Sequence, residues 1–357
     1  MYPEGYRGFE SHRVFRLDAA GPAQQNPAKR REIPSYSVFA RLRLPSAPMP
    51  STLPERTREY RNHHLDSTRW DGFVARDDDI VVTTAYKAGT TWTQRILAAL
   101  LVPGPVDLMA ESPWVDARFH GPLEPMLAGL EAQDHRRFVK SHLAADGLLF
   151  FPQAKYVVVG RDTRDVFMSL WNHYSAYTDL AYSLFNDTDR PGPEFPRAPE
   201  SPRELWPRWI SEGWFDWEPD GWPFWSHHHH QSTWWAVREQ PNIIFVHYGD
   251  LLADTRAEIQ RLADFLGIEV PEARWASLLE EVTIDAMRRH ARGAADEDPA
   301  AMIFEGGVQR FLYKGTNGRW RDVLTDDDLA LYEKAAAALD PQLRTWLEGG
   351  RHAVRMA

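Results

Sequence analysis

Four short apolar runs alternate with segments of helical periodicity, and this alternation constrains the fold more than any other feature of the sequence. The runs cover residues 79–84, 137–141, 155–160 and 242–248, and helices are predicted over 91–101, 164–177 and 255–266 and from about Thr325 onward. Continuous apolar strands separated by helices are typical of a parallel sheet covered on both faces. The sequence therefore predicts an α/β fold, a single domain with a central parallel sheet flanked by helices.

The composition excludes several classes of protein. The chain of 357 residues has no cysteine, so it has neither disulfide bonds, nor a thiolate zinc site, nor a cysteine nucleophile. Its net charge of −10 argues against a general affinity for nucleic acid or anionic membranes. The longest strongly apolar run, 96–102, is far shorter than the roughly 20 residues that span a bilayer. Because the chain also opens without the apolar core of a signal peptide, we expect a cytoplasmic protein with no membrane span and no nucleic-acid partner.

Residues 1–48 differ from the rest of the chain. They hold eight Lys and Arg against four Asp and Glu, a balance of +4, and prolines interrupt any periodic pattern. Such a segment is typical of an extended or disordered N-terminal arm, although a translation start at Met49 would remove it from the protein. The predicted domain spans residues 49–357 and includes a tryptophan-rich insertion at about 185–235.

The loop after the first predicted strand has the character of a phosphate-binding loop. It reads Ala85-Tyr-Lys-Ala-Gly-Thr-Thr-Trp92, and the next helix opens at the threonines. Gly89 permits a tight turn, and the amides of Thr90 and Thr91 are free at a helix N-terminus to meet an anion. The loop is P-loop-like but is not a Walker A motif, since Thr90 stands where that motif has its lysine. An ordinary strand-to-helix turn capped by a threonine is the alternative.

Polar side chains also follow the other predicted strands. Lys140-Ser-His142 ends the second strand, Arg161 follows the third with Ser169 in the next helix, and Lys314-Gly315 lies in a basic loop near the C-terminus. Taken singly, each of these residues could be a solvated or locally paired side chain with no role in ligand binding. Because ligands of open α/β sheets bind beyond the carboxyl ends of the strands, the set together indicates a ligand with two separated anionic groups.

At this point the sequence resembles a known family, the cytosolic-type sulfotransferases that use 3′-phosphoadenosine 5′-phosphosulfate (PAPS), in their bacterial aryl or glycolipid branch. Residues 86–92, YKAGTTW, resemble the family's 5′-phosphosulfate loop Y-P-K-S-G-T-T-W, with Ala88 in place of Ser. Residues 161–169, RDTRDVFMS, are similar to its 3′-phosphate motif R-x-x-[KR]-D-x-x-x-S. Residues 313–321, YKGTNGRWR, are similar to R-K-G-x-x-G-D-W-K, and residues 140–142 correspond to K-T-H. Four motifs stand in the family's order.

The resemblance implies a role for each matching residue. It makes His142 the general base that deprotonates an acceptor hydroxyl, and it makes Lys87 and Lys140 the groups that stabilise the charge of the transferring sulfuryl group and the leaving phosphate. An unperturbed histidine pKa of about 6.5 would suit that base. PAPS is then the co-substrate and 3′-phosphoadenosine 5′-phosphate (PAP) the product, with no metal required. The implied nucleotide-binding residues are Lys87, Ala88, Gly89, Thr90, Thr91, Trp92, Arg161, Ser169, Tyr248, Thr283, Lys314 and Gly315.

The sequence departs from the family pattern in two places. Tyr313 stands where the family has an arginine that contacts the 3′-phosphate, and Arg319 replaces an acidic residue. The family's C-terminal dimer motif is poorly matched around Thr325, where Asp326 replaces Val and Ala330 replaces Glu. We therefore do not expect dimerisation through that motif, and the oligomeric state stays open.

Eight of the fifteen tryptophans lie within thirty residues of the predicted insertion, at positions 206, 209, 214, 217, 222, 225, 234 and 235. One interpretation is a packed helical subdomain, since tryptophan supplies a large buried area. The other, which follows the family's use of this region, is an aromatic-lined pocket for a small-molecule or lipid acceptor such as a phenol, alcohol, steroid or glycolipid. The run His227–His230 is predicted to be a solvated or wall-lining stretch before the next helix rather than a metal site.

The leading prediction is a sulfotransferase that moves the sulfuryl group of PAPS to a hydroxyl acceptor by in-line displacement. A P-loop nucleotide kinase is the first alternative, against which the misplaced lysine argues. A non-catalytic nucleotide-binding protein is the second, against which the presence of His142, Lys87 and Lys140 argues.

Overall fold

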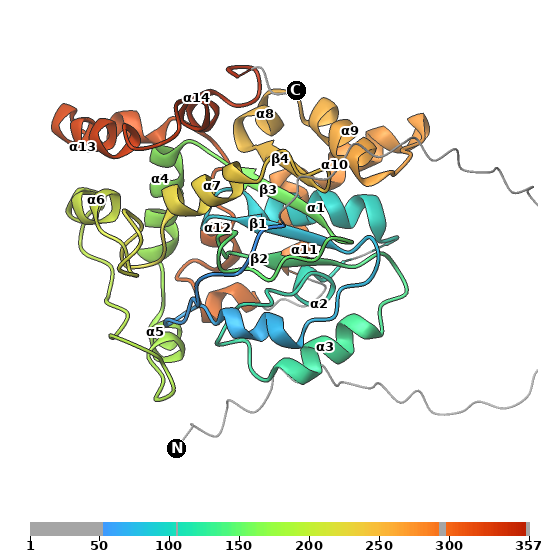
Figure 1. Ribbon diagram of the computed structural model, residues 1–357, viewed down its shortest axis with the longest axis horizontal. Coiled ribbons are helices and arrows are strands. Elements are labelled where there is room, and N and C mark those ends of the chain that lie inside the picture. Colours follow the sequence, from blue (N-terminus) through green and yellow to red (C-terminus); the bar gives the residue numbers. More distant parts are fainter. Residues whose placement is uncertain (1–52, 105, 293–297, 355–357) are drawn as a thin grey trace, which may run out of the picture. The chain divides into compact units, whose positions relative to one another are not determined.

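The computed structural model describes residues 53–104, 106–292 and 298–354, which belong to one compact unit spanning Pro48–Ala357. The predicted N-terminal arm, residues 1–48, lies outside the described residues. The centre of the described part is a four-stranded parallel sheet in the order β2-β1-β3-β4 (Figure 1). The strands are β1 (Ile80–Thr84), β2 (Phe138–Ser141), β3 (Lys155–Gly160) and β4 (Ile243–His247). The predicted α/β fold is confirmed.

The strands are buried on both faces, which explains why they read as unbroken apolar runs. Side chains of a strand alternate between faces, so Ile80 and Val82 of β1 pack with the helices α1, α8, α9 and α10. Val81 of the same strand and Val158 of β3 point the other way, into a larger core with α4, α6, α7 and α14. Figure 1 shows these two groups of helices on opposite sides of the sheet.

Helices connect the strands and continue after the last one. Their bounds are α1 (Thr90–Leu101), α2 (Leu108–Glu111), α3 (Leu123–Glu131), α4 (Thr163–Tyr174), α5 (Asp179–Phe185), α6 (Pro202–Ser211), α7 (His227–Ala236), α8 (Tyr248–Ala253), α9 (Thr255–Leu266), α10 (Trp275–Glu281), α11 (Ile284–Arg292), α12 (Gly307–Phe311), α13 (Asp326–Ala336) and α14 (Pro341–Gly349). Short 3₁₀ helices lie at η1 (Ser67–Gly72), η2 (Glu272–Arg274), η3 (Pro299–Met302) and η4 (Arg319–Asp322). Within the described ranges, no helix has the length and apolar character needed to cross a bilayer.

The predicted element ends are mostly right to within one or two residues. The helix predicted over 164–177 ends earlier, at Tyr174, because Tyr177 pairs with Phe304 in an isolated β-bridge. The last predicted strand ends at His247, and Tyr248 instead opens α8. The C-terminal helix α13 begins at Asp326, where Thr325 forms the capping box.

The tryptophan-rich segment is mainly structural. Trp206, Trp209, Trp234 and Trp235 are at most 3% exposed and belong to the larger core. The packed helical interpretation is therefore correct for these four, which lie on α6 and α7. Trp225, in the loop before α7, lies instead beside the candidate site.

Candidate active site

The residues that follow the four strands meet at one edge of the sheet. The parallel register pairs Thr83 with Ser141, Thr84 with Val159 and Gly160 with His247, so the carboxyl ends of the strands are level. The predicted phosphate loop, His142, Arg161 and Tyr248 each come directly after one of these ends. The predicted convergence of these segments at the carboxyl edge is confirmed.

The loop between β1 and α1 needs its glycine. Gly89 has a φ of +131°, and a Cβ atom there would lie 2.9 Å from Cδ2 of Tyr248. Lys87 also has a positive φ, of 64°, which is unusual for a residue other than glycine. The loop ends at the first turn of α1, whose backbone N–H groups have no partners within the helix. A strained loop that presents free amides at a helix N-terminus suits an anion.

Tyr248 is at the centre of one end of the site. Its ring packs edge-on against Trp92, with centroids 5.3 Å apart, and the guanidinium carbon of Arg161 lies 4.1 Å above it. Gly315 approaches from the C-terminal loop, where an added Cβ would lie 3.6 Å from the Tyr248 hydroxyl. The structure thus brings together Tyr248, Trp92, Arg161 and Gly315, which come from four separate segments.

Arg161 holds the C-terminal loop in place. Its Nε donates to Oδ1 of Asn317 at 2.9 Å, and its Nη2 donates to the backbone oxygen of Thr316 at 3.0 Å. The next residue, Gly318, donates its N–H to Asp165 on α4 at 2.6 Å. The loop at residues 315–318 is therefore tied to the segment that follows β3.

His142 is oriented by the backbone and by Asp116. Its Nδ1 lies 2.8 Å from the carbonyl oxygen of Thr84, and because a carbonyl only accepts, Nδ1 carries the proton and Nε2 keeps its lone pair. Its backbone N–H donates to the buried carboxylate of Asp116, which also accepts from the indoles of Trp70 and Trp114. Nε2 of His142 is therefore the nitrogen able to accept a proton.

A hydroxyl pair connects the phosphate loop to this histidine. The hydroxyl of Thr84 lies 2.6 Å from that of Thr90 and 3.1 Å from Nδ1 of His142. Burial, together with the charges of Lys140, His230 and Lys87, holds the pKa of His142 well below its usual value. The expectation of a near-normal pKa is therefore wrong, since a ring that is 2% exposed is deprived of water.

Two lysines lie beside His142 with depressed pKa values. Burial, with the charges of Lys140 and Arg161, lowers the pKa of Lys87 to about 7. Burial lowers the pKa of Lys140 to about 8, although Asp116 opposes this, and its ammonium lies 4.3 Å from the Trp114 ring centroid. Both lysines gain charge when an anion arrives.

Lys87 begins a chain of hydrogen bonds toward the aromatic region. Its Nζ lies 3.1 Å from Nδ1 of His173, whose Nε2 lies 2.7 Å from the hydroxyl of Tyr86. That hydroxyl in turn lies 2.8 Å from the hydroxyl of Tyr177. When Lys87 is charged, its ammonium only donates, so His173 then accepts at Nδ1 and donates at Nε2.

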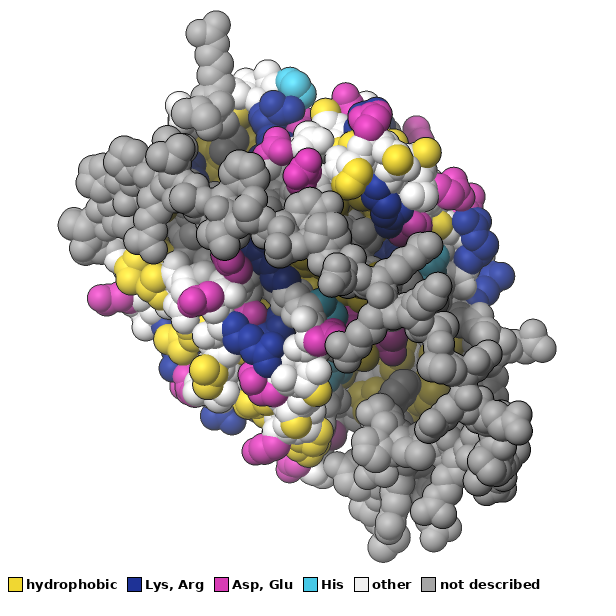
Figure 2. Space-filling view, turned by 90° about the vertical axis from the view of Figure 1, so that its right-hand side faces the viewer, with side chains coloured by type: hydrophobic (Ala, Val, Ile, Leu, Met, Phe, Trp, Pro, Cys, Tyr) yellow, Lys and Arg dark blue, Asp and Glu magenta, His cyan; other side chains and the backbone are white. Residues whose placement is uncertain are grey.

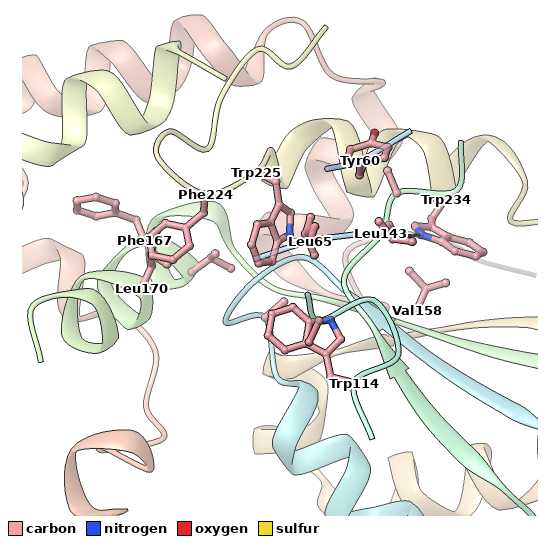
Figure 3. Close-up of a cluster of buried hydrophobic side chains, with 14 of the residues drawn as sticks. Tyr60, Leu65, Trp114, Leu143, Val158, Phe167, Leu170, Phe224, Trp225 and Trp234 are labelled. Carbon is pink, nitrogen blue, oxygen red and sulfur yellow. Dashed lines mark hydrogen bonds between the residues drawn. The ribbon is translucent and has the colours of Figure 1, made fainter. Parts of the chain in front are cut away.

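Aromatic side chains surround His142. The rings of Trp114, Tyr86 and Trp225 lie 4.8, 5.3 and 5.5 Å from its ring. Figure 3 shows Trp114 and Trp225 close together, with Phe224 beyond them, and the two indoles are 6.2 Å apart. Among the eight clustered tryptophans, Trp225 is the one that contributes directly to this wall.

Five other predicted site residues lie less centrally. Thr91 is half-buried in the first turn of α1, and Ser169 is half-buried on α4, on the helix face shared with Asp165 and His173. Thr283 is exposed, and its hydroxyl accepts from the N–H of Ala286 in α11 and donates to the backbone oxygen of Glu280, so both of its hydrogen bonds are local. Ala88 is fully buried, and Lys314 is exposed with its ammonium 5.4 Å from the Tyr313 ring.

The histidine run is not solvated. His227–His230 forms the first turn of α7, and three of its four side chains are buried. His230 bonds the hydroxyl of Thr83, and His228 bonds that of Thr163. The prediction of a solvated or wall-lining stretch before the helix is wrong about solvation and about its place, because α7 begins at His227 itself and buries three of the four side chains. Over the described ranges, no cluster of three or more His, Asp or Glu side chains could hold a metal ion.

Asp116 and His173 also belong to the site, and neither is predicted from the sequence. Asp116 follows no strand and belongs to no motif, so nothing in the sequence separates it from the other acidic residues. His173 lies four residues after Ser169, and that spacing puts both on one face of a helix. A search for polar side chains on the helix face that carries Ser169 would have found it.

The comparisons with known proteins agree with this geometry. The family model for the sulfotransferase domain matches residues 77–344. A glycolipid sulfotransferase of Mycobacterium tuberculosis is 32% identical over 313 residues, covering 82% of this chain and 94% of the relative. Sulfotransferase 1A1 of Rattus norvegicus is 26% identical over 262 residues, covering 71% and 81%. The chain therefore belongs to the sulfotransferase domain family and is a sulfotransferase enzyme.

Solved structures show the same fold. A mouse sulfotransferase, SULT7A1, in complex with PAP superposes with a TM-score of 0.59 at 18% identity, covering 80% of this chain and 92% of that one. A retinol dehydratase in complex with androsterone and PAP gives a TM-score of 0.57 at 20% identity, covering 76% and 84%. The family assignment also removes the kinase alternative.

Proposed function

We propose that this enzyme transfers the sulfuryl group of PAPS to a hydroxyl acceptor, with His142 as the general base. One observation carries the proposal. Through the hydroxyls of Thr90 and Thr84, the phosphate loop is hydrogen-bonded to a histidine whose Nε2 keeps its lone pair. The donor loop and a proton acceptor are thus built into one unit, as transfer from a bound anion to a hydroxyl requires.

The donor would bind along the carboxyl edge of the sheet. The loop amides and the side chains of Lys87, Thr90 and Thr91 would hold its 5′-phosphosulfate. Trp92 and Tyr248 would contact the adenine. The 3′-phosphate would meet Arg161 and Ser169, together with Lys314 and Gly315 of the C-terminal loop. Two contacts support this arrangement. Arg161 lies over the Tyr248 ring and donates to Thr316 of the C-terminal loop, and Gly315 of the same loop lies beside the Tyr248 hydroxyl.

The transfer step requires one base and a stabilised leaving group. The acceptor oxygen attacks sulfur while its proton moves to Nε2 of His142. The bond from sulfur to the bridging phosphate oxygen breaks, and the electron pair stays on the 5′-phosphate of the released PAP. Lys87 and Lys140 would stabilise the negative charge that develops on these oxygens. Since two ammonium groups supply that charge, no metal ion is required for the step.

A glycolipid is the acceptor class that we favour. The wall around His142 is aromatic, and rings of this kind bind sugars, phenols and steroids. Sugar hydroxyls have the further support of the 32% identical relative, which is named a glycolipid sulfotransferase. A small-molecule phenol, alcohol or steroid is the second candidate class, since Trp114, Tyr86 and Trp225 would pack equally on such rings.

We extend the proposal to the organisation of the chain. Residues 49–357 would form the sulfotransferase domain, and the segment at about 185–235 would serve as its acceptor insertion. Trp225 supports the second part, because it reaches the wall around His142 from this segment. The charges on the face in Figure 2 are interspersed, with Lys and Arg beside Asp and Glu over the described residues. This distribution suits a small or lipid acceptor better than a nucleic acid.

A pair of histidine variants tests the assignment. His142→Ala should bind PAP as the wild type does and lose turnover, because the base is absent while the donor site is intact. His352→Ala is the matched control, since His352 is exposed near the C-terminus. Normal turnover in His142→Ala would remove this histidine from the mechanism. No turnover of the wild type over a broad acceptor panel would instead favour a non-catalytic nucleotide-binding protein.

A further inference from the structure

The C-terminal loop contains an arginine whose bonding capacity is unused. Nε of Arg319 is shielded from solvent and has no hydrogen-bond partner within the described part of the chain. An arginine N–H is a strong donor that is rarely left unpaired inside a protein. The environment of Arg319 therefore calls for an acceptor that the protein itself does not provide.

The loop places Arg319 close to Arg161. Hydrogen bonds from Arg161 to Thr316 and Asn317, and from Gly318 to Asp165, hold residues 316–318 in place. These residues immediately precede Arg319. Gly318 itself has a φ of +84°, which turns the chain into η4, where Arg319 is the first residue. The backbone position of Arg319 thus follows from the same contacts that Arg161 makes with this loop.

The positive charges of Arg161 and Arg319 act on each other and on the same neighbouring side chain. Burial lowers the pKa of Arg161, Tyr248 and Asp165 oppose this, and the charge of Arg319 adds a smaller lowering. The charges of both arginines also act on the hydroxyl of Tyr248. Asp165 is close enough to offset part of this repulsion. Like charges held at a partly buried position are unfavourable unless an anion lies between them.

Tyr313 lies in the same loop, but it meets Arg319 with its ring rather than as an anion between the two arginines. Three cations lie around its ring, namely Arg310, Lys314 and Arg319, at 5.7, 5.4 and 5.3 Å from the centroid. Its backbone oxygen accepts from Arg288. The Tyr313 ring is thus a surface on which these cations pack. An anion that binds here would contact the cations rather than the ring.

We propose that Arg319 determines the nucleotide specificity of the enzyme by binding, together with Arg161, the second phosphate group of the donor. This rests on the proposed function, which brings a 3′-phosphorylated adenine nucleotide to Arg161. It goes beyond that function in assigning the selectivity to Arg319, at which the sequence departs from the family motif and to which the resemblance gives no role. Two guanidinium groups then form charge-assisted hydrogen bonds to one phosphate.

The test compares two ligands that differ only in the 3′-phosphate. Isothermal titration calorimetry measures the Kd values of PAP and of adenosine 5′-monophosphate (AMP) for the wild type and for Arg319→Met, which keeps an unbranched stem beside Tyr313. We expect Arg319→Met to bind PAP about 10- to 100-fold more weakly, the usual effect of losing a hydrogen bond to a charged group. We expect its affinity for AMP to stay within about twofold of the wild type, since AMP makes no use of this position.

Two further variants complete the experiment. Arg321→Met is the matched control, because Arg321 lies two residues away and packs on Trp320 at 4.4 Å; both of its affinities should stay unchanged. Arg319→Lys keeps the positive charge but not the planar guanidinium with its several N–H donors. It should lose less PAP affinity than Arg319→Met. An equal loss for PAP and AMP in Arg319→Met, or no loss for PAP, would overturn the assignment. A wild type that binds PAP no better than AMP would refute the proposed donor itself, which is a different result.

Discussion

Replacing Lys87 by arginine should remove most of the proton uptake that accompanies PAP binding. The pKa of Lys87 is lowered to about 7 in the nucleotide-free protein, first by burial and then by Lys140 and Arg161. A bound phosphate favours the charged ammonium and raises this pKa again. Binding above pH 7 must therefore draw a proton from solution, whereas an arginine stays protonated throughout and draws none.

The expected magnitude follows from the pKa. A group with a pKa of about 7 is about nine-tenths neutral at pH 8, so Lys87 takes up about 0.9 proton there and about 0.1 at pH 6. Lys140, with a pKa of about 8, adds about 0.5 proton at pH 8. Affinity for PAP is accordingly highest below pH 7 and falls as the pH rises through 7 and then 8.

Calorimetry in buffers of different ionisation enthalpy measures this uptake directly. At pH 8 the phosphates of PAP are themselves fully deprotonated, because their second pKa lies near 6. The wild type should take up more than one proton per PAP at this pH, and Lys87→Arg should take up only the part that belongs to Lys140. Equal uptake in the two proteins, or none in the wild type, would refute the account of Lys87.

Three further variants test other parts of the structure. Gly89→Ala should weaken PAP binding at least tenfold, because its Cβ would lie 2.9 Å from Tyr248 at a φ of +131°; Gly129→Ala in α3, with nothing within 4 Å, is the control that should leave binding unchanged. Asp116→Asn should lower the free energy of unfolding by about 1–3 kcal/mol, since an amide cannot accept from all the donors around it, and an unchanged denaturant midpoint would contradict this. Trp209→Ala should cost about 3–5 kcal/mol in chemical denaturation, far more than truncating the half-buried Trp222, and a similar cost for both would show that burial in α6 is not what matters.

The positions of the candidate-site residues were largely predictable from the sequence. Lys87, His142, Arg161 and Tyr248 each follow an apolar strand, and in a parallel sheet such residues must meet at one edge. Short buried strands leave little freedom in register, so a local pattern was enough to place residues that lie far apart in the chain.

The remaining features depend on contacts that leave no pattern in the sequence. Asp116 accepts from His142 and Trp70, which are far from it in the chain, as well as from its neighbour Trp114. The buried state of His228 and His230 depends on hydroxyls of β1 and α4. A histidine is found both in solvent and in the core, so the residue type alone did not show whether His228 and His230 are buried. The pKa of His142 was misjudged for the same reason, because its burial is a property of the packed aromatic wall rather than of the motif.

Sulfuryl transfer itself is tested most directly by the mass of the product. The wild type is incubated with PAPS, a chelator and a panel of glycolipids, phenols and steroids, and acceptor masses are followed together with PAP release. The account predicts that at least one acceptor gains one SO₃ group for each PAP released, with no added metal ion, and that His142→Ala forms neither product. PAP release without a sulfated acceptor, or transfer at the wild-type rate in His142→Ala, would contradict it.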